Sequence, residues 1–516
     1  MAVLLVVFDG FGVAAPSFGN AVWRARTPNL DAIAREGFVT SLKSSGLAVG
    51  LPWGEPGNSE VGHLTLGSGR VFYHHLPRII LAIRDGSFFK NEAFKQAVAY
   101  VRKTGGTVHL AGLVSSGGVH AYIDHLYALL EFFKREGVTK LALHVFTDGR
   151  DAEPHEGGKF LPQLEERLRK LGIGRIASLC GRFYAMDRDN HWDRTEKAWR
   201  LLVEGEGDHA KDLFSYFEKY YPQGLSDEFI PPTLILGEDN IPDIVKDGDS
   251  LVFFNFREDS ERQLARAFGQ KDFEGFTRAK TKKIFFVTMT QYLEGLDVAV
   301  AFSPIAVSDT LGETVAGAGL KQLRIAETEK YAHVTYFLNG GKERAFPGEE
   351  RRIIPSLEVS RLEEHPEMRA KEITEEIIRS SDMKEYDLMV ANYANADMLG
   401  HTGNFNACVE AVEILDNEIA VIADRARAGN FTLFLTGDHG NIEEKIDPRT
   451  GRALTEHTTN PVPLYVLGSG LPEHFRGLRE ISPDEPRGLL SDVAPTILTV
   501  MNLPVPAAMT GHNLFS

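Results

Sequence analysis

Residues 3–10 read Val-Leu-Leu-Val-Val-Phe-Asp-Gly, six apolar residues followed directly by an aspartate and a glycine. A continuous apolar run of this length is typical of a strand that is buried on both faces, as in a parallel sheet. No basic segment precedes the run, so we interpret it as a strand and not as a secretory signal. Asp9 then lies at the carboxyl end of the strand, where open α/β sheets bind their ligands.

The same kind of apolar run recurs along the chain. Further strands are predicted at residues 108–114, 141–147, 175–180, 251–256, 283–288, 387–393, 431–436 and 463–467. Longer segments of helical character lie between many of them, for example at residues 121–135, 159–171, 192–203 and 406–427. This alternation predicts an α/β fold with parallel sheets that helices cover on both faces.

The composition excludes several classes of protein. Of the 516 residues, 43% are hydrophobic and 25% are charged, as is usual for a globular protein. The formal net charge of −16 argues against nucleic acid or an anionic membrane surface as a partner. No run approaches the roughly 20 apolar residues of a membrane span. Cys180 and Cys408 allow at most one long-range disulfide, and we expect a cytoplasmic protein.

Polar residues adjoin the predicted strands near both ends of the chain. They are Asp9, Asp397, Asp438, His439 and His457. If these residues share one site, the chain between them must leave that domain and return to it. We therefore expect residues 1–73 and 305–516 to form one discontinuous domain, and residues 74–304 to form an inserted α/β domain.

The same residues are candidate metal ligands. Asp397 and His401 are four residues apart, so a helical segment would place both on one face. Together with the other acidic and histidine side chains they exceed what one tetrahedral ion requires, which favours two divalent ions. Nitrogen and oxygen ligands without thiolate fit Mn²⁺, Mg²⁺ or Zn²⁺. The alternative interpretation is that buried polar residues simply cap the sheet ends.

Residues 57–63 read Gly-Asn-Ser-Glu-Val-Gly-His, and they place Ser59 among glycines before a helical stretch. The run is not the G-x-S-x-G elbow of α/β-hydrolases, because Val61 stands two residues after the serine. A serine hydroxyl needs a base or a metal to become a good nucleophile, and the predicted metal site would supply one. The alternative is that Ser59 is only a helix N-cap.

The middle segment combines arginines with one nearby carboxylate, although the chain as a whole is acidic. Arg150, Arg182, Arg188 and Arg257 follow predicted strands, where bidentate recognition of phosphate or carboxylate is favoured. Residues 115–120 add a loop of small residues that ends in His120, and Asp151 is a candidate general acid or base. The chain has neither a P-loop nor a strand-linked dinucleotide motif.

These motifs resemble those of the 2,3-bisphosphoglycerate-independent phosphoglycerate mutases, almost from end to end and in order. The motifs are residues 8–10, 57–63, 116–120, 147–151, 181–188, 255–257, 329–334, 395–401, 436–441 and 456–458. The resemblance implies an alkaline-phosphatase-like domain with an inserted phosphotransferase domain. It also implies interconversion of 3-phosphoglycerate and 2-phosphoglycerate through a phosphoserine, and we expect a monomer.

The resemblance further implies a role for each matching residue. Asp397, His401 and His457 would hold one Mn²⁺, and Asp9, Ser59, Asp438 and His439 would hold the second. Mg²⁺, Zn²⁺ and Co²⁺ stay open as the ion. Ser59 would be the phosphorylated nucleophile. The substrate site would consist of His120, Arg150, Asp151, Arg182, Arg188, Arg257 and Lys330, of which only Lys330 is not suggested by the residues alone.

One position departs from the family pattern. The family has a second arginine three residues after the one at Arg257, but this chain has Ser260 there, followed by Arg262. Either Arg262 takes over or the substrate clamp is weaker. Independently of this position, two alternatives to the mutase stay open: a metal-dependent phosphatase of the same superfamily, and a non-catalytic metal-binding or scaffold protein. A phosphopentomutase-like enzyme is disfavoured by residues 116–120 and 181–188.

Overall fold

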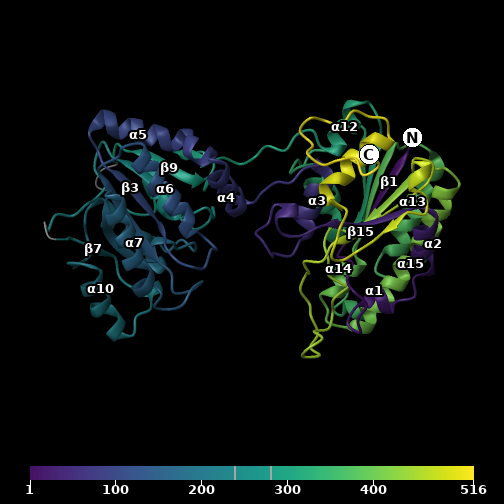
Figure 1. Cartoon of the computed structure of the whole chain (residues 1–516), viewed down its shortest axis with the longest axis horizontal. Helices are drawn as coiled ribbons and strands as arrows, with labels where there is room; N and C mark the ends of the chain where they lie inside the picture. Colours follow the sequence, from purple (N-terminus) through teal and green to yellow (C-terminus); the bar gives the residue numbers. More distant parts are fainter. Residues whose placement is uncertain (238–239, 279–281) are drawn as a thin grey trace. The chain divides into compact units, whose positions relative to one another are not determined.

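The computed structural model of the chain describes residues 1–237, 240–278 and 282–516. These residues form two compact units. Unit 1 consists of Met1–His74 and Ile305–Ser516, and unit 2 consists of His75–Pro304. Each unit has its own sheet with helices against it, which confirms the predicted α/β class (Figure 1).

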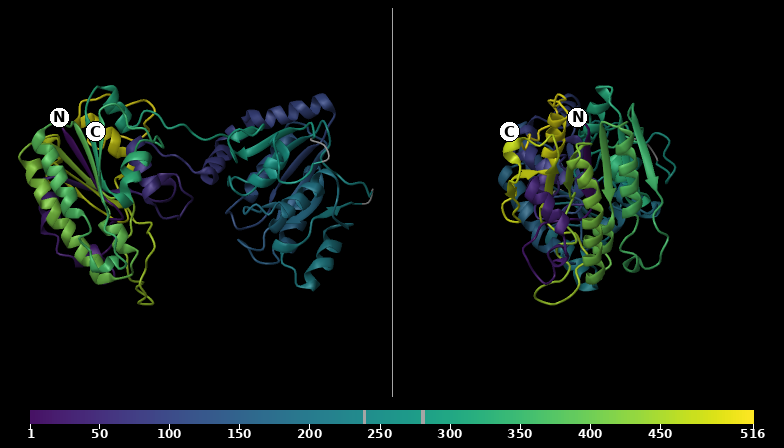
Figure 2. Two further views of the ribbon diagram at one scale, coloured as in Figure 1. Left: turned by 180° about the vertical axis from the view of Figure 1, so that it is seen from behind. Right: turned by 90° about the vertical axis from the view of Figure 1, so that its right-hand side faces the viewer.

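Unit 1 is built from segments of both chain ends. Its strands are β1 (Val3–Phe8), β2 (Phe38–Lys43), β11 (Gln322–Glu327), β12 (Glu349–Ile354), β13 (Leu388–Tyr393), β14 (Thr432–Thr436), β15 (Val462–Leu467), β16 (Arg479–Glu480) and β17 (Gly488–Leu489). Its α-helices are α1 (Ala21–Arg24), α2 (Pro28–Glu36), α3 (Ser59–Ser68), α12 (Leu311–Gly317), α13 (Ala370–Met383), α14 (Asn395–Gly400), α15 (Phe405–Arg427) and α16 (Val493–Val500). The N- and C-terminal ends of the chain lie close together in this unit (Figure 2).

The sheet of unit 1 has the strand order β12-β11-β13-β1-β14-β15-β2-β16, with β17 also paired to β2. Strand β1 is central and runs parallel to both β13 and β14. Its side chains alternate between two cores: Leu4 and Val6 pack with residues of α13 and α15, whereas Leu5 and Val7 pack with residues of α12 and α16. The apolar run that opens the chain is therefore covered by helices on both faces (Figures 1 and 2).

Unit 2 contains the remaining elements. Its strands are β3 (Val108–Leu113), β4 (Leu141–Thr147), β5 (Arg175–Gly181), β6 (Asp208–Ala210), β7 (Thr233–Ile235), β8 (Ser250–Phe253), β9 (Phe285–Thr290) and β10 (Ala299–Phe302). Its α-helices are α4 (His75–Asp85), α5 (Glu92–Thr104), α6 (Ile123–Arg135), α7 (Gly157–Leu171), α8 (Arg182–Ala185), α9 (Trp192–Val203), α10 (Leu213–Tyr220) and α11 (Arg262–Gly269). The strand order is β10-β9-β8-β3-β4-β5-β7-β6.

Among the described residues most strand pairs are parallel, as predicted, but three pairs are antiparallel. Strand β15 runs against both β14 and β2, and β7 runs against β5. Strand β11 was not predicted, because it buries Gln322, Arg324 and Glu327 and so lacks a continuous apolar run. A buried polar strand is invisible to a search for apolar periodicity.

Two further expectations concern the cysteines and the membrane. Cys180 and Cys408 are both buried and free, so the long-range disulfide that the sequence left open is absent. Within the parts of the chain that the structure describes, none of the helices combines the length and the apolar character needed to cross a membrane.

Candidate active site

Three neighbouring strands of unit 1 bring the polar residues of both chain ends together. The strands β13, β1 and β14 are adjacent and parallel, so their carboxyl ends meet at one edge of the sheet. Asp9 follows β1, Asp397 lies in α14 just after β13, and Asp438 follows β14. All three carboxylates are buried, with at most 4% of the residue exposed.

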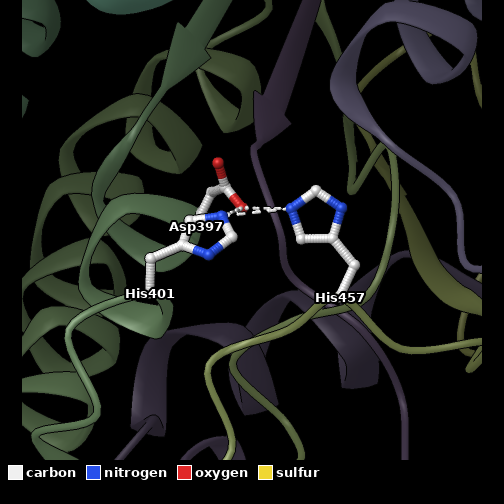
Figure 3. A group of neighbouring side chains, drawn as sticks. All are labelled: Asp397, His401 and His457. Carbon is white, nitrogen blue, oxygen red and sulfur yellow. Dashed lines mark hydrogen bonds and ion pairs between the residues drawn. The ribbon is translucent and has the colours of Figure 1, made fainter. Parts of the chain in front are cut away.

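One group of side chains has three electron-pair donors pointing at one spot (Figure 3). The Nδ1 atoms of His401 and His457 face the backbone carbonyls of Thr455 and Gly57 at 2.7 and 2.9 Å, so each donates its proton there. In the neutral imidazoles the Nε2 atoms are then unprotonated. They lie 3.1 Å apart, and each lies 3.2 Å from Oδ1 of Asp397, whose hydrogen bond raises the pKa of His401. Such an arrangement repels unless a cation lies at its centre, which suits a metal ion.

Ser59 is the first residue of helix α3, but it does not cap that helix. The N-cap is Asn58, whose side chain accepts from the backbone N–H of Val61 at 3.1 Å. The hydroxyl of Ser59 is therefore free for other contacts, and the interpretation of Ser59 as only an N-cap is wrong. The side chain is buried at the same sheet edge as the three carboxylates.

Lys330 joins the serine to two of the carboxylates. Its Nζ lies 2.5 Å from Oδ1 of Asp9, 2.7 Å from Oδ2 of Asp397 and 2.9 Å from the hydroxyl oxygen of Ser59. Burial alone would lower the pKa of Lys330, but the two carboxylates outweigh it and hold the pKa above its ordinary value. The lysine is therefore a permanent cation beside the serine.

His439 lies on the other side of the serine. Its Nε2 is 3.1 Å from the hydroxyl of Ser59 and 3.6 Å from Oδ1 of Asp9. Burial lowers the pKa of His439, but the nearby carboxylates, Asp438 first, raise it to about 9. The negative charge of the three buried carboxylates thus favours nearby positive charge, including the protonated form of this imidazole. Divalent ions would supply the missing positive charge directly.

One carboxylate oxygen of Asp438 accepts hydrogen bonds and the other does not. Its Oδ1 accepts from the backbone N–H groups of Gly10 and His439 at 3.1 and 3.0 Å. Its Oδ2 is buried and accepts no hydrogen bond from the described residues; Nδ1 of His63 lies 3.2 Å away but faces the backbone carbonyl of Ser59 at 2.9 Å. A buried carboxylate oxygen that accepts no hydrogen bond costs free energy unless a cation contacts it, so the donor set fits a bound metal.

Two residues at this edge were missed by the sequence analysis. His63 lies one helical turn after Ser59, with Nδ1 3.2 Å from Oδ2 of Asp438, and the spacing of four residues within the 57–63 run could have indicated it. Asn392 donates from Nδ2 to Oδ2 of Asp9 at 2.8 Å. It lies inside β13, where no sequence signal separates it from the apolar residues around it.

In unit 2 a second cluster forms around Arg182. Its Nη1 donates to Oδ1 of Asp148 at 2.7 Å and to Oδ2 of Asp151 at 2.6 Å, and its Nη2 lies 2.8 Å from Nε2 of His120. Arg182 and His120 are buried, whereas a quarter of the Asp151 side chain is exposed. Burial, and then the charges of Arg182 and Arg257, lower the pKa of His120 to about 4. This imidazole is neutral at pH 7.

The hydrogen bonds of His120 have only one possible direction. A guanidinium only donates, so Nε2 accepts from Arg182 and Nδ1 carries the proton. That Nδ1 lies 3.1 Å from the hydroxyl of Ser260, which in turn donates to the backbone carbonyl of Arg257 at 2.6 Å. Ser260 thus joins the imidazole to the loop that carries Arg257.

The other arginines of the predicted substrate site are paired with carboxylates. Asp259 lies between Arg188 and Arg257, 2.9 Å from each guanidinium. Arg150 contacts Glu228 at 2.6 Å. Arg150, Arg182 and Arg188 line one pocket with Glu228. These ion pairs satisfy the arginines within the unit, and an anionic ligand would compete with the carboxylates for them.

The predicted site residues therefore fall into two sets. Unit 1 gathers Asp9, Ser59, Lys330, Asp397, His401, Asp438, His439 and His457. In unit 2, Arg182 contacts both His120 and Asp151. Arg188 and Arg257 both contact the carboxylate of Asp259. Lys330 belongs to the first set and not to the arginine cluster. Arg262 donates its Nε to the carbonyl of Tyr292 at 2.8 Å.

Comparison with known proteins is consistent across sequence and structure. The family model described as BPG-independent PGAM N-terminus matches residues 79–294. The 2,3-bisphosphoglycerate-independent phosphoglycerate mutase of Clostridium beijerinckii is 48% identical over 513 residues, which cover 99% of this chain and 98% of the relative.

Two further relatives extend the comparison. The 2,3-bisphosphoglycerate-independent phosphoglycerate mutase of Moorella thermoacetica is 47% identical over 515 residues, with 99% and 98% coverage of the two chains. A crystal structure of Leishmania mexicana phosphoglycerate mutase at low cobalt concentration matches with a TM-score of 0.53 and 31% identity, covering 99% of this chain and 97% of that one. The chain therefore belongs to the family of 2,3-bisphosphoglycerate-independent phosphoglycerate mutases.

Proposed function

We propose that this chain interconverts 3-phosphoglycerate and 2-phosphoglycerate without 2,3-bisphosphoglycerate, through a phosphoserine on Ser59. The observation that carries the proposal is the environment of the Ser59 hydroxyl, which lies 2.9 Å from the Lys330 ammonium and 3.1 Å from both His439 and Asp9. A buried serine beside a permanent cation and a carboxylate is a suitable nucleophile for phosphoryl transfer.

The proposal includes two divalent metal ions in unit 1, with Mn²⁺ as the expected ion. Asp397, His401 and His457 would hold one ion, and Asp9, Ser59, Asp438 and His439 would hold the other. The converging Nε2 atoms, and the buried Oδ2 of Asp438 that accepts no hydrogen bond from the described residues, support this assignment. When bound, such ions lower the pKa of a coordinated hydroxyl and neutralise the charge of a transferred phosphoryl group.

The residues of unit 1 then act as follows. Asp9 accepts a hydrogen bond from the hydroxyl of Ser59 and orients the oxygen for attack on phosphorus. Lys330 donates to the same oxygen, and its positive charge favours the deprotonated form of the hydroxyl. Because Lys330 also contacts both Asp9 and Asp397, its position does not depend on the substrate.

We assign substrate recognition to unit 2. Arg150, Arg182 and Arg188 line a shared pocket, and their planar guanidinium groups suit the carboxylate and phosphate of phosphoglycerate. Asp151, which is partly exposed next to Arg182, would exchange protons with the glycerate hydroxyls. His120 is neutral and its Nε2 accepts from Arg182, so its role is to orient that arginine.

Replacement of the nucleophile tests this function. Ser59→Ala is expected to lower mutase turnover at least about 1000-fold, because no other hydroxyl contacts Lys330 in the described residues. Formation of 2-phosphoglycerate from 3-phosphoglycerate, with Mn²⁺ and without bisphosphoglycerate, is the measurement. Ser68→Ala is the matched control, since Ser68 ends the same helix and donates only to backbone carbonyls.

The same assay separates the mutase from a phosphatase of the same superfamily. A mutase returns the phosphoryl group from Ser59 to the bound glycerate, which predicts rapid 2-phosphoglycerate formation with little free phosphate. Free phosphate without isomerisation would favour the phosphatase instead. Mutase turnover that survives in Ser59→Ala would remove Ser59 from its proposed role.

A further inference from the structure

Lys445 is a buried lysine behind the Asp397 group, and neither the proposed chemistry nor the sequence analysis uses it. It lies in the loop between β14 and β15, and only 1% of it is exposed. Its Nζ donates to the backbone carbonyls of Gly400 and Glu456 at 3.2 and 3.3 Å. Gly400 directly precedes His401, and Glu456 directly precedes His457. One ammonium group thus holds the backbone beside both histidines.

The third contact of Lys445 is with the side chain of Asn441. The ammonium group donates to Oδ1 of this amide. A lysine can only donate, so the amide oxygen must face it and the NH₂ group must face the other way. That NH₂ donates to Oδ1 of Asp397 at 2.8 Å, and it lies 3.5 Å from Nε2 of His401. The lysine therefore determines which end of the amide faces the Asp397 group.

The amide has little room for any other orientation. Asn441 is fully buried. A Cβ placed on Gly400 would lie 2.5 Å from Oδ1 and 2.7 Å from Cγ of Asn441, which means that the amide packs directly on the glycine backbone. A flipped amide would place its oxygen against the carboxylate of Asp397 and its NH₂ against the ammonium of Lys445. Both contacts are repulsive.

We propose that Lys445 is a positioning residue for the metal site formed by Asp397, His401 and His457. It holds the two histidine backbones at their present separation, and it makes Asn441 present an N–H donor to Asp397 instead of an oxygen ligand. This inference rests on the proposed metal site. It concerns the geometry of the ligands and not their identity.

The direction in which Mn²⁺ affinity changes when Lys445 is replaced distinguishes a positioning role from a purely electrostatic one. Loss of a nearby positive charge would by itself tighten the binding of a divalent cation. Loss of positioning does the opposite, since mutation of groups that orient metal ligands typically weakens metal binding about 10- to 100-fold. We expect Lys445→Met to weaken Mn²⁺ binding at this site by about that factor.

The experiment is a calorimetric titration of MnCl₂ into the metal-free full-length protein. The binding step that belongs to this site is the one that disappears in His401→Ala. Asn441→Ala removes the amide but keeps the lysine, so it tests the same connection if Lys445→Met fails to fold. Lys371→Met is the control, because the side chain of Lys371 is 77% exposed on helix α13.

A double mutant shows whether the two residues act together. If Lys445 acts through Asn441, the affinity lost in Lys445→Met and Asn441→Ala combined is smaller than the sum of the two single losses. Electron paramagnetic resonance of bound Mn²⁺ gives a second readout, since a displaced histidine or an added oxygen ligand changes its spectrum. We expect a changed spectrum in Lys445→Met and an unchanged one in Lys371→Met.

Several results would overturn the inference. Unchanged or tighter Mn²⁺ binding in Lys445→Met, with a wild-type spectrum, would show that the lysine does not position the site. If the losses of Mn²⁺ affinity in Lys445→Met and Asn441→Ala were fully additive in the double mutant, Lys445 would not act through Asn441. A wild-type protein that binds no Mn²⁺ would instead count against the proposed function, so the two failures are distinguishable.

Discussion

The hydroxyl of Ser260 replaces an arginine of the family pattern, yet it is joined to two of the proposed substrate residues. It accepts from the imidazole of His120 and donates to the carbonyl of Arg257. In Ser260→Ala the Nδ1–H of a buried imidazole loses its acceptor, which costs about 1–3 kcal/mol. We expect kcat/KM for 3-phosphoglycerate to fall about 10-fold in steady-state assays, mainly through a higher KM, because the imidazole that accepts from Arg182 is no longer anchored by Ser260.

Nuclear magnetic resonance of ¹⁵N-labelled histidine provides the independent check for Ser260. The wild-type protein should show the proton of His120 on Nδ1, and in Ser260→Ala this proton should exchange faster with solvent because it has lost its acceptor. Ser87→Ala, on the exposed surface of unit 2, is the control. A wild-type kcat/KM together with an unchanged exchange rate of the Nδ1 proton in Ser260→Ala would rule out this positioning role.

At the scale of the element, helix α6 buries a histidine that makes no hydrogen bond with the described residues. Both ring nitrogens of His125 are unpartnered, and the ring packs edge-on against Tyr122 and Phe256. Burial lowers the pKa of His125 to about 3. Because an unsatisfied buried polar group costs about 1–3 kcal/mol, we expect His125→Phe to raise the free energy of unfolding of unit 2 by up to about that amount.

The same shift predicts how the stability of unit 2 depends on pH. The unfolded histidine titrates near 6.5 and the folded one near 3, so the unfolded chain binds more protons between these values. Stability is therefore fully present above pH 6.5 and falls as the pH decreases toward 3. Urea unfolding should show that the free energy of unfolding decreases less between pH 7.5 and pH 5.0 in His125→Phe than in the wild type. The exposed His209→Phe is the control, and an equal loss in wild type and His125→Phe would contradict the argument.

At the scale of the whole molecule, the proposed metal ligands all belong to unit 1. An ion that binds only the folded unit stabilises it by about 2.7 kcal/mol at 100 times the dissociation constant. We expect Mn²⁺ to slow amide hydrogen exchange in β1, β13, β14 and α14, and a chelator to reverse the effect. Exchange in β3, β4 and β5 of unit 2 should stay the same.

Unit 2 also contains a group of potential ligands, Asp187, Asp189 and His191, which makes the comparison informative. The carboxylate of Asp187 already accepts from Arg194, Gln263 and His191 at 3.0 Å each, so it has no unmet need for a cation. Equal slowing of exchange in both units would show that a metal binds this second group, and would contradict the assignment to unit 1 alone.

The sequence alone was sufficient to predict the α/β class, because apolar runs such as residues 3–8 report burial on both faces directly. It also drew attention to the residues that meet at the sheet edge of unit 1. Carboxyl ends of parallel strands share one edge, so Asp9, Asp397 and Asp438 could be grouped without coordinates. Their roles in metal binding remain proposals.

Only the tertiary structure decided how these groups contact one another. Strand β11 escaped detection because its buried residues are partly polar, and burial of a polar side chain depends on partners distant in the sequence. The contacts of Lys330, Asn392 and Lys445 were hidden for the same reason. A lysine or asparagine in sequence is most often a surface residue, and only three-dimensional packing shows that its hydrogen bonds are made to residues tens or hundreds of positions away.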